Sequence, residues 1–249
     1  FLSIIILSFI CLNSINSQDY KFGEVSKLEL QEKKYPMDSA ANAAILYRYE
    51  NVRFEFSQNN GFTQIKEVIM KIKIYNKEGL DWANEKIYLY KGNSGSDETI
   101  KGIKGFTYNL KNGKIEKDKL KSDGIFNEKA TDLYSICSFA LPNVKAGSII
   151  EYKYTIRSPF IQIDDIELQF SIPVKKLDVS ISTPQFYKYK MRLNPKAFYI
   201  PTYTEKKINK TLSVSNRVSN NSPSSGINQF GNGSKISQNS ISYFDNNII

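Results

Sequence analysis

Residues Phe139–Phe160, with the sequence FALPNVKAGSIIEYKYTIRSPF, decide the fold of this 249-residue chain. From Ile150 to Arg157, apolar or aromatic side chains alternate with charged or polar ones, which is the period-two pattern of a half-buried β-strand. Proline, asparagine and glycine precede this strand, and Ser158-Pro159 follows it. One face of the strand is therefore expected to point into a core. The stretch predicts the middle strand of an antiparallel meander.

Similar patterns flank this stretch on both sides. Asn59-Asn60-Gly61 and Asn112-Gly113 are predicted hairpin turns, and Ser26 with Glu29 fits the capping box of a short helix. More than eight short strands with turn residues between them favour an all-β, antiparallel two-sheet β-sandwich-like domain with minor short helices. Besides the strand already described, strands are predicted at 44–56, 64–75, 86–90, 99–110, 114–116, 125–127, 133–141, 161–171, 177–183, 187–193 and 210–216.

The two ends of the chain predict its domain organisation. Residues 1–17 are an apolar run that ends in small polar residues, which predicts the later part of a secretory signal peptide cleaved near Ser17-Gln18. The alternative, a membrane anchor, needs a longer run of roughly 20 apolar residues. Residues 18–249 are expected to form a single β-rich domain, truncated at its C-terminus. Its Ser/Asn-rich segment at about 219–240 predicts a flexible loop, with a domain linker as the alternative.

The charge of +9 first suggests a nucleic acid or an anionic surface as partner. Only five of the 34 basic residues are arginine, the residue best suited to bidentate phosphate and base contacts. The lysines are spread along the whole chain, which is typical of the solvated outer face of strands. No nucleic-acid partner is therefore expected, and no transmembrane span is expected after removal of the signal peptide.

The sequence offers few groups for catalysis. It contains no histidine, and after removal of the leader Cys137 is its only cysteine, with apolar neighbours that predict a buried structural thiol. Trp82 is expected to fill the core, with a ligand-stacking platform as the alternative. Asp164, Asp165 and Glu167 form the densest group of carboxylates, and solvent-facing strand charges are favoured over an acid–base pair or a Ca²⁺ site. No catalytic, cofactor-binding or metal-binding residue is predicted, and no cofactor.

Several segments together resemble a known family. They are FGEVSKLEL at Phe22–Leu30, DSAANAAILY at Asp38–Tyr47, FALPNVKAGSIIEYKY at Phe139–Tyr154, SPF at Ser158–Phe160 and LQFSIPV at Leu168–Val174. The chain resembles domain-of-unknown-function family 3857, found at the front of exported bacterial proteins. The resemblance implies a β-sandwich-like module outside the cytoplasm, usually followed by a transglutaminase-like domain with a Cys-His-Asp site. It supplies no catalytic residues for this chain.

Three functions are consistent with these residues. The favoured one is a non-catalytic N-terminal accessory or interaction module of an exported, periplasmic or cell-surface or secreted, transglutaminase-like (cysteine peptidase-like) bacterial protein. Its partner is then the downstream transglutaminase-like domain of the same polypeptide. The alternative is an independent extracellular glycan- or peptide-binding β-sandwich module, with aromatic side chains as stacking platforms. A third hypothesis is a hydrolase that uses Asp164, Asp165 and Glu167.

Overall fold

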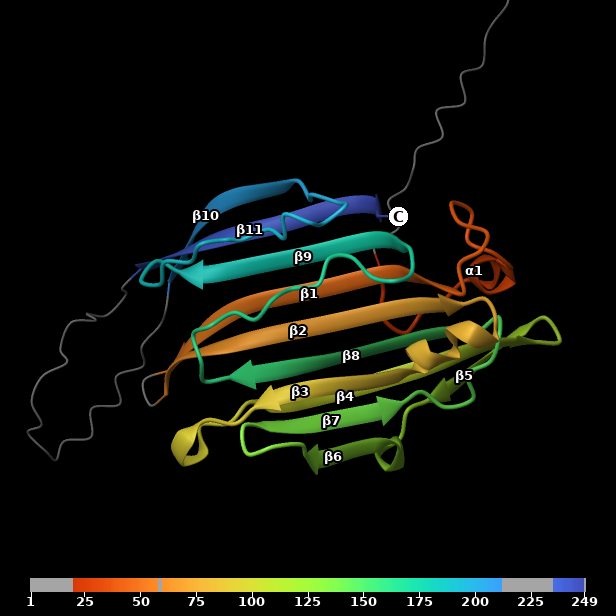
Figure 1. Cartoon of the computed structure of the whole chain (residues 1–249), viewed down its shortest axis with the longest axis horizontal. Helices are drawn as coiled ribbons and strands as arrows, with labels where there is room; N and C mark the ends of the chain where they lie inside the picture. Colours follow the sequence, from red (N-terminus) through yellow and green to blue (C-terminus); the bar gives the residue numbers. More distant parts are fainter. Residues whose placement is uncertain (1–19, 58–59, 212–234, 249) are drawn as a thin grey trace, which may run out of the picture.

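The computed structural model describes residues 20–57, 60–211 and 235–248, and shows two β-sheets with short helices (Figure 1). The predicted all-β, two-sheet class is confirmed. An eight-stranded sheet has the order β10-β11-β9-β1-β2-β8-β4-β5, and a three-stranded sheet has the order β3-β7-β6. Their bounds are β1 Ala43–Ser57, β2 Gly61–Ile74, β3 Asn84–Tyr90, β4 Thr99–Lys111, β5 Lys114–Lys119, β6 Ile125–Lys129, β7 Tyr134–Ala140, β8 Ile149–Ser158, β9 Val174–Pro184, β10 Tyr203–Thr211 and β11 Lys235–Ile248.

The local signals of the sequence are found where they are expected. The short helix α1, Lys27–Gln31, begins at Ser26 with the predicted capping box to Glu29. At the β4–β5 hairpin, Asn112 and Gly113 have φ values of 50° and 72°, the left-handed region that such a turn requires. Three 3-10 helices complete the described part: η1 Lys77–Ala83, η2 Asn93–Gly95 and η3 Ser122–Gly124.

Two predicted strands are not found: residues 187–193 form no strand, and neither does the segment between β8 and β9. Residues 161–171 pair with no strand, although Ile166, Leu168 and Phe170 pack on the core as their spacing indicates. The reason is topological: β9 pairs with β1 in parallel, whereas the other ladders are antiparallel. A connection between two strands that run in the same direction must return along the face of the sheet. We call residues 159–173 the crossover; in Figure 1 it passes in front of β2 and β1.

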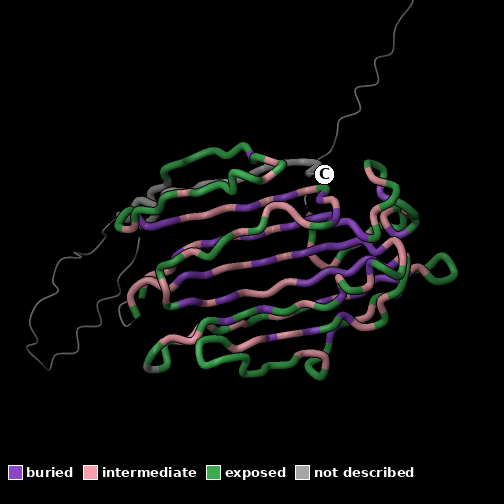
Figure 2. The backbone as a smooth tube through the Cα atoms, in the orientation of Figure 1, coloured by how far each residue is buried: buried purple, intermediate pink, exposed green. Residues whose placement is uncertain are grey.

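The main core lies between the two sheets. The three-stranded sheet packs on β8 and its neighbours. The ring centroids of Phe139 on β7 and Tyr152 on β8 are 5.3 Å apart. Buried Ile72 and Ile150 lie side by side in this face, and Cys137 of β7 belongs to the same core cluster. Figure 2 shows that the buried residues are concentrated in the central strands. Cys137 is fully buried and unpaired, and burial raises the pKa of its thiol, which confirms the predicted structural thiol.

The opposite face of the large sheet is also covered near the start of β8. The pattern of β8 predicts one buried face, but Glu151 on the other face is fully buried. The N-terminal segment, residues 20–35, covers it: Leu30 forms a second apolar cluster with Tyr108 and Ile149. A strand at the centre of a sheet is buried on both faces wherever another segment packs on each side.

Three predictions concern segments that are only partly described. Of the strand predicted at 210–216, residues 210 and 211 belong to β10 and the rest lies outside the described residues. The predicted signal peptide at 1–17 lies outside the described residues. The predicted loop at 219–240 lies outside them as far as residue 234, whereas Lys235–Ser240 belong to β11, so the loop prediction extends too far. Within the described residues, no helix is long and apolar enough to cross a bilayer.

Candidate functional site

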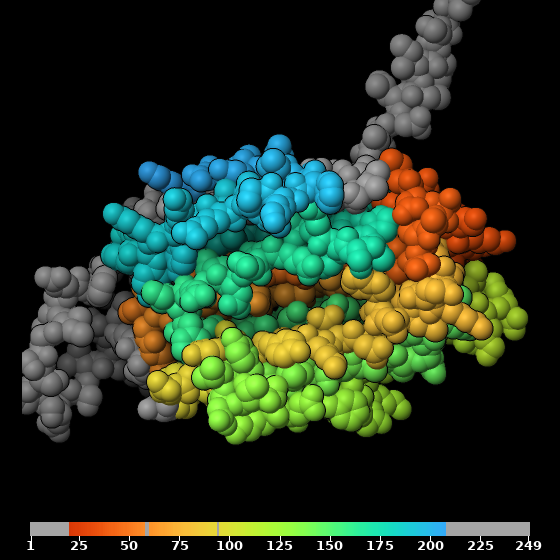
Figure 3. Space-filling model, viewed as in Figure 1, coloured from red at the N-terminus to blue at the C-terminus, as the bar shows by residue number. Residues whose placement is uncertain are grey.

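A cavity of about 330 Å³ opens between the crossover and the small sheet. In Figure 3 it is the hollow between the teal crossover and the yellow η1–β3 segment. Strands β1, β2 and β8 form its floor, η1 and β3 one wall, and the crossover the other wall. Its volume is at the lower end of the range for small-ligand sites, about 300 to 1,000 Å³. The lining residues are Arg48, Val68, Met70, Trp82, Glu85, Tyr152, Tyr154, Glu167, Phe170 and Ser171.

Sheet register places the floor residues beside one another. Arg48 on β1 is opposite Met70 on β2, which in turn is opposite Tyr152 on β8. Val68 and Tyr154 form the next row on the same face. Because adjacent strands lie about 4.8 Å apart, these rows give a floor three strands wide with one cation, two apolar side chains and two phenols.

Arg48 is a buried cation with only part of its hydrogen-bonding capacity used. It is 8% exposed, and its Nη2 donates to Glu50, two residues further along the same face of β1. Its guanidinium carbon lies 5.9 Å from the centre of the Phe170 ring. Its Nε–H is buried and has no acceptor among the described residues. A buried donor without an acceptor costs about 1 to 3 kcal/mol, so Arg48 is a costly residue for packing alone.

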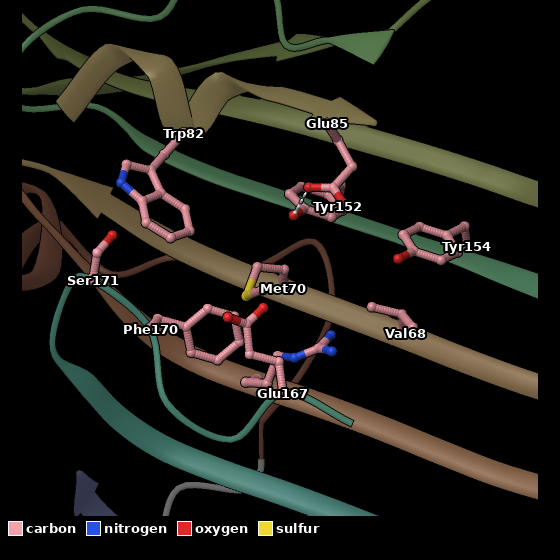
Figure 4. A pocket seen from close by; sticks show the side chains of 10 residues that line it. Val68, Met70, Trp82, Glu85, Tyr152, Tyr154, Glu167, Phe170 and Ser171 are labelled. Carbon is pink, nitrogen blue, oxygen red and sulfur yellow. Dashed lines mark hydrogen bonds between the residues drawn. The ribbon is translucent and has the colours of Figure 1, made fainter. Parts of the chain in front are cut away.

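Glu85 brings a carboxylate from β3 into the cavity. The Tyr152 hydroxyl donates to its Oε2 at 2.6 Å, the bond drawn as a dashed line in Figure 4. Burial raises the pKa of Glu85; the Tyr152 hydrogen bond and the Arg48 charge act against this, and the negative charge of Glu167 adds to it. Burial also raises the pKa of the Tyr152 and Tyr154 phenols, which therefore remain protonated donors at neutral pH.

Aromatic rings form much of the remaining wall. Trp82 and Phe170 face each other from opposite sides of the cavity (Figure 4), with ring centroids 6.4 Å apart at an angle of 66°. Tyr152 and Tyr154 are nearly parallel, with centroids 6.4 Å apart. Trp82 is half-buried and packs on the core, as predicted. It also lines the cavity, where a ligand-stacking platform, the alternative prediction, would have to lie. The cavity therefore combines aromatic faces, two carboxylates and a guanidinium.

The three carboxylates singled out in the sequence do not converge. Asp164, Asp165 and Glu167 are all exposed. Asp164 lies 3.5 Å from the ammonium of Lys66, and only Glu167 lines the cavity. Among the described residues, no group of three or more acidic, histidine or cysteine side chains is placed to hold a metal ion.

Sequence reasoning missed Arg48 and Glu85, although a local signal existed. Arg48 and Glu50 alternate in step with the buried Val52 and Phe54, so all four side chains lie on the same, core-facing side of β1. Glu85 likewise shares the parity of Ile87 and Leu89 on β3. A charge on the core-facing parity of a strand is unusual, because burying it is unfavourable without a partner. These positions are therefore candidates for a site.

The fold and the cavity define an all-β, two-sheet domain with a potential ligand site between its sheets. Residues 63–220 match the model of the domain of unknown function DUF3857, so the chain belongs to this family. No curated protein matches the chain.

Two solved structures are similar. A crystal structure described as that of a candidate protease from Parabacteroides distasonis superposes with a TM-score of 0.50 at 17% identity, over 83% of this chain and 36% of that one. This chain thus spans about a third of the length of that protein, and the likeness shows a shared fold. A structure described as a candidate nutrient-binding protein from Legionella pneumophila gives a TM-score of 0.28 at 7% identity, over 82% of this chain and 67% of that one.

Proposed function

We propose that this chain is a non-catalytic interaction module of a longer exported protein, and that it acts by contact through the cavity between its sheets. The observation that carries the proposal is the composition of the cavity. It offers a buried guanidinium, phenol donors, carboxylates and aromatic faces, which are binding groups. It contains no serine, threonine or cysteine beside a base: its one hydroxyl nucleophile, Ser171, is exposed and has no described hydrogen bond to either carboxylate.

The size relation to the Parabacteroides structure supports a module within a longer chain. That protein contains this fold in about a third of its length. The partner proposed here is a transglutaminase-like domain in the same polypeptide, outside the cytoplasm. Its test is the parent reading frame: we expect a cysteine followed at a distance by histidine and aspartate. A frame without these residues would remove the transglutaminase-like partner from the proposal.

The absence of catalysis is tested with the purified chain. Peptide, ester and glycoside substrates are incubated with it, and the products are followed by mass spectrometry. We expect no turnover. Turnover that disappears in Glu85→Gln or Glu167→Gln would show that the cavity carboxylates perform chemistry, and the module would then be an enzyme.

A second candidate is an independent binding module for extracellular peptide or glycan. The observation in its favour is that Trp82 and Phe170 line a cavity that opens to solvent. Aromatic side chains of this kind supply much of the contact area in small-ligand sites. Saturable binding of a peptide or a sugar by the purified chain alone would support this candidate, whereas binding that needs the rest of the polypeptide would support the accessory role.

A further inference from the structure

The charges of the cavity determine which ligands it favours. Its single cation, Arg48, already has a carboxylate partner in Glu50. Glu85 and Glu167 have no cationic hydrogen-bond or ion-pair partner among the described residues. The negative charge of Glu167 raises the pKa of Glu85, although the positive charge of Arg48 acts more strongly in the opposite direction. A positively charged ligand would relieve this repulsion, whereas a second anion would add to it.

The aromatic rings and the apolar floor indicate which kind of cation the cavity favours. An ammonium group is attracted to the faces of tryptophan and tyrosine, and Trp82 and Tyr154 both border the cavity. Val68 and Met70 give the floor an aliphatic strip that fits a short carbon chain. A metal ion would find at most two carboxylates here, which is too few for a protein-built Ca²⁺ site. An organic ammonium is the better match.

Unused donors on the floor indicate a second feature of the ligand. The Nε–H of Arg48 is buried out of reach of a ligand, but Nη1 also has no acceptor among the described residues and is not one of the buried atoms. The Tyr154 hydroxyl also makes no described hydrogen bond, although it lines the cavity. Arg48 Nη1 and the Tyr154 hydroxyl are therefore free to donate to an oxygen of a ligand. Ammonium and carbonyl oxygen are neighbours at the amino terminus of a peptide and in a free amino acid.

We infer that the cavity binds an α-amino group together with its adjacent carbonyl or carboxylate oxygen, as in a peptide amino terminus or a free amino acid. The ammonium lies toward Glu85 and Glu167, and the oxygen lies toward Arg48. With about 330 Å³ available, the site holds one or two residues and leaves the rest of a peptide outside. This inference rests on the proposed binding function and names its ligand class.

The chain contains its own reporter for the test. Trp82 is the only tryptophan of the sequence and lies in the cavity wall. Its fluorescence is excited at a wavelength that tyrosine does not absorb, while Leu-Gly-Gly, L-leucine, N-acetyl-Leu-Gly-Gly and maltose are titrated up to about 10 mM, a range that reveals even weak binding. Calorimetry on the same samples measures binding independently of the ring. We expect saturable binding of Leu-Gly-Gly or L-leucine, and binding of the acetylated peptide weaker by about tenfold or more.

The two ammonium probes distinguish the possible sources of this chemistry. Tighter binding of the tripeptide indicates a peptide terminus, and tighter binding of L-leucine indicates a free amino acid. Equal binding of the free and acetylated peptides, binding of maltose alone, or no heat and no fluorescence change with any probe would overturn the inference. None of these outcomes is turnover, so the inference can fail while the non-catalytic function stands.

Matched variants locate the binding. Glu85→Gln keeps an oxygen that accepts from Tyr152 but removes the charge, and we expect about tenfold weaker binding of the ammonium probe. Glu128→Gln on exposed β6 of the same sheet is the control and should bind as the unmodified chain does. If Glu85→Gln fails to fold by circular dichroism, Glu167→Gln on the exposed crossover provides the same test. Unchanged binding in the folded cavity variants would contradict the inference.

Discussion

Replacing Glu151 tests how the N-terminal segment is attached to the large sheet. Glu151 is fully buried on β8, on the face opposite the cavity. It accepts hydrogen bonds from the Tyr20 hydroxyl, from the backbone N–H of Gly23 at 2.7 Å and from the Tyr108 hydroxyl at 3.0 Å. Two of these donors belong to the N-terminal segment and one to β4. Glu151→Ala therefore removes both acceptor oxygens and leaves three donors near a small cavity.

The size of the effect follows from these contacts. A hydrogen bond to a charged group contributes about 1.5 to 3 kcal/mol, so three give a gross upper value of several kcal/mol. Burial opposes this, because it is the largest influence on the pKa of Glu151 and raises it despite the three hydrogen bonds. Part of the gross gain is thus lost to desolvation of the carboxylate. We expect Glu151→Ala to lower the free energy of unfolding by about 2 to 4 kcal/mol.

Urea unfolding followed by circular dichroism measures this difference, with Glu128→Ala on exposed β6 as the control. Limited trypsin digestion supplies a second readout. Lys21 and Lys27 lie in the N-terminal segment, and we expect cleavage there to become faster than in the unmodified chain. A loss below about 1 kcal/mol together with unchanged digestion would refute the role of Glu151 as the anchor of this segment.

Three further predictions concern other buried positions. Lys73 donates to the carbonyls of Leu30 and Gly147, and burial lowers its pKa to about 8. The free energy of unfolding should therefore increase as pH rises from about 8 toward the ordinary pKa of lysine. In Lys73→Met, the midpoints of urea unfolding should lack this increase. Cys137 should react with a thiol reagent only in urea, and peptide mapping that finds it modified in the native chain would contradict its burial. Gly79→Ala places a Cβ 2.4 Å from the backbone oxygen of Asn42, so a thermal unfolding series should show a loss of roughly 2 kcal/mol.

The sequence predicts the parts of the fold that depend on neighbouring residues. The β4–β5 hairpin is set by Asn112-Gly113, whose backbone conformation few other residues adopt readily. The capping box at Ser26 likewise acts within one helical turn. Both signals involve residues close in the chain, so no knowledge of the tertiary structure is needed to interpret them.

The errors arise where distant segments decide the outcome. Alternation at 161–171 correctly indicates which side chains face the core, but it says nothing about which backbone groups pair. The crossover lies on the face of the sheet because β9 runs parallel to β1, a choice made by the whole topology. Burial of Glu151 depends on Tyr20 and Gly23, more than a hundred residues earlier. No local pattern around β8 contains this information.

The cavity could be predicted in part. Arg48 and Glu85 are charges on core-facing parities, and such positions can be recognised from alternation alone. The sequence does not show that Arg48 and Glu85 line one cavity, because this depends on how the three-stranded sheet packs over β1, β2 and β8. Glu167 attracts attention in the sequence because Asp164 and Asp165 precede it. In the structure, the carboxylate that its charge acts on is Glu85 of β3, in the three-stranded sheet.

The same charges bear on why the cavity exists. Because burial raises the pKa of Glu85, its charged form is less favourable in the folded chain than in the unfolded chain, and its contribution to stability is lost as pH rises through that raised pKa. Arg48 adds a buried donor without an acceptor. Apolar side chains at both positions would avoid these costs, and local violations of packing rules are typical of functional sites. A ligand with an ammonium group would offset the cost at Glu85, and its oxygen would use the remaining donors of the floor, which is why the cavity, and not the exposed carboxylates of the crossover, is the place to look for function.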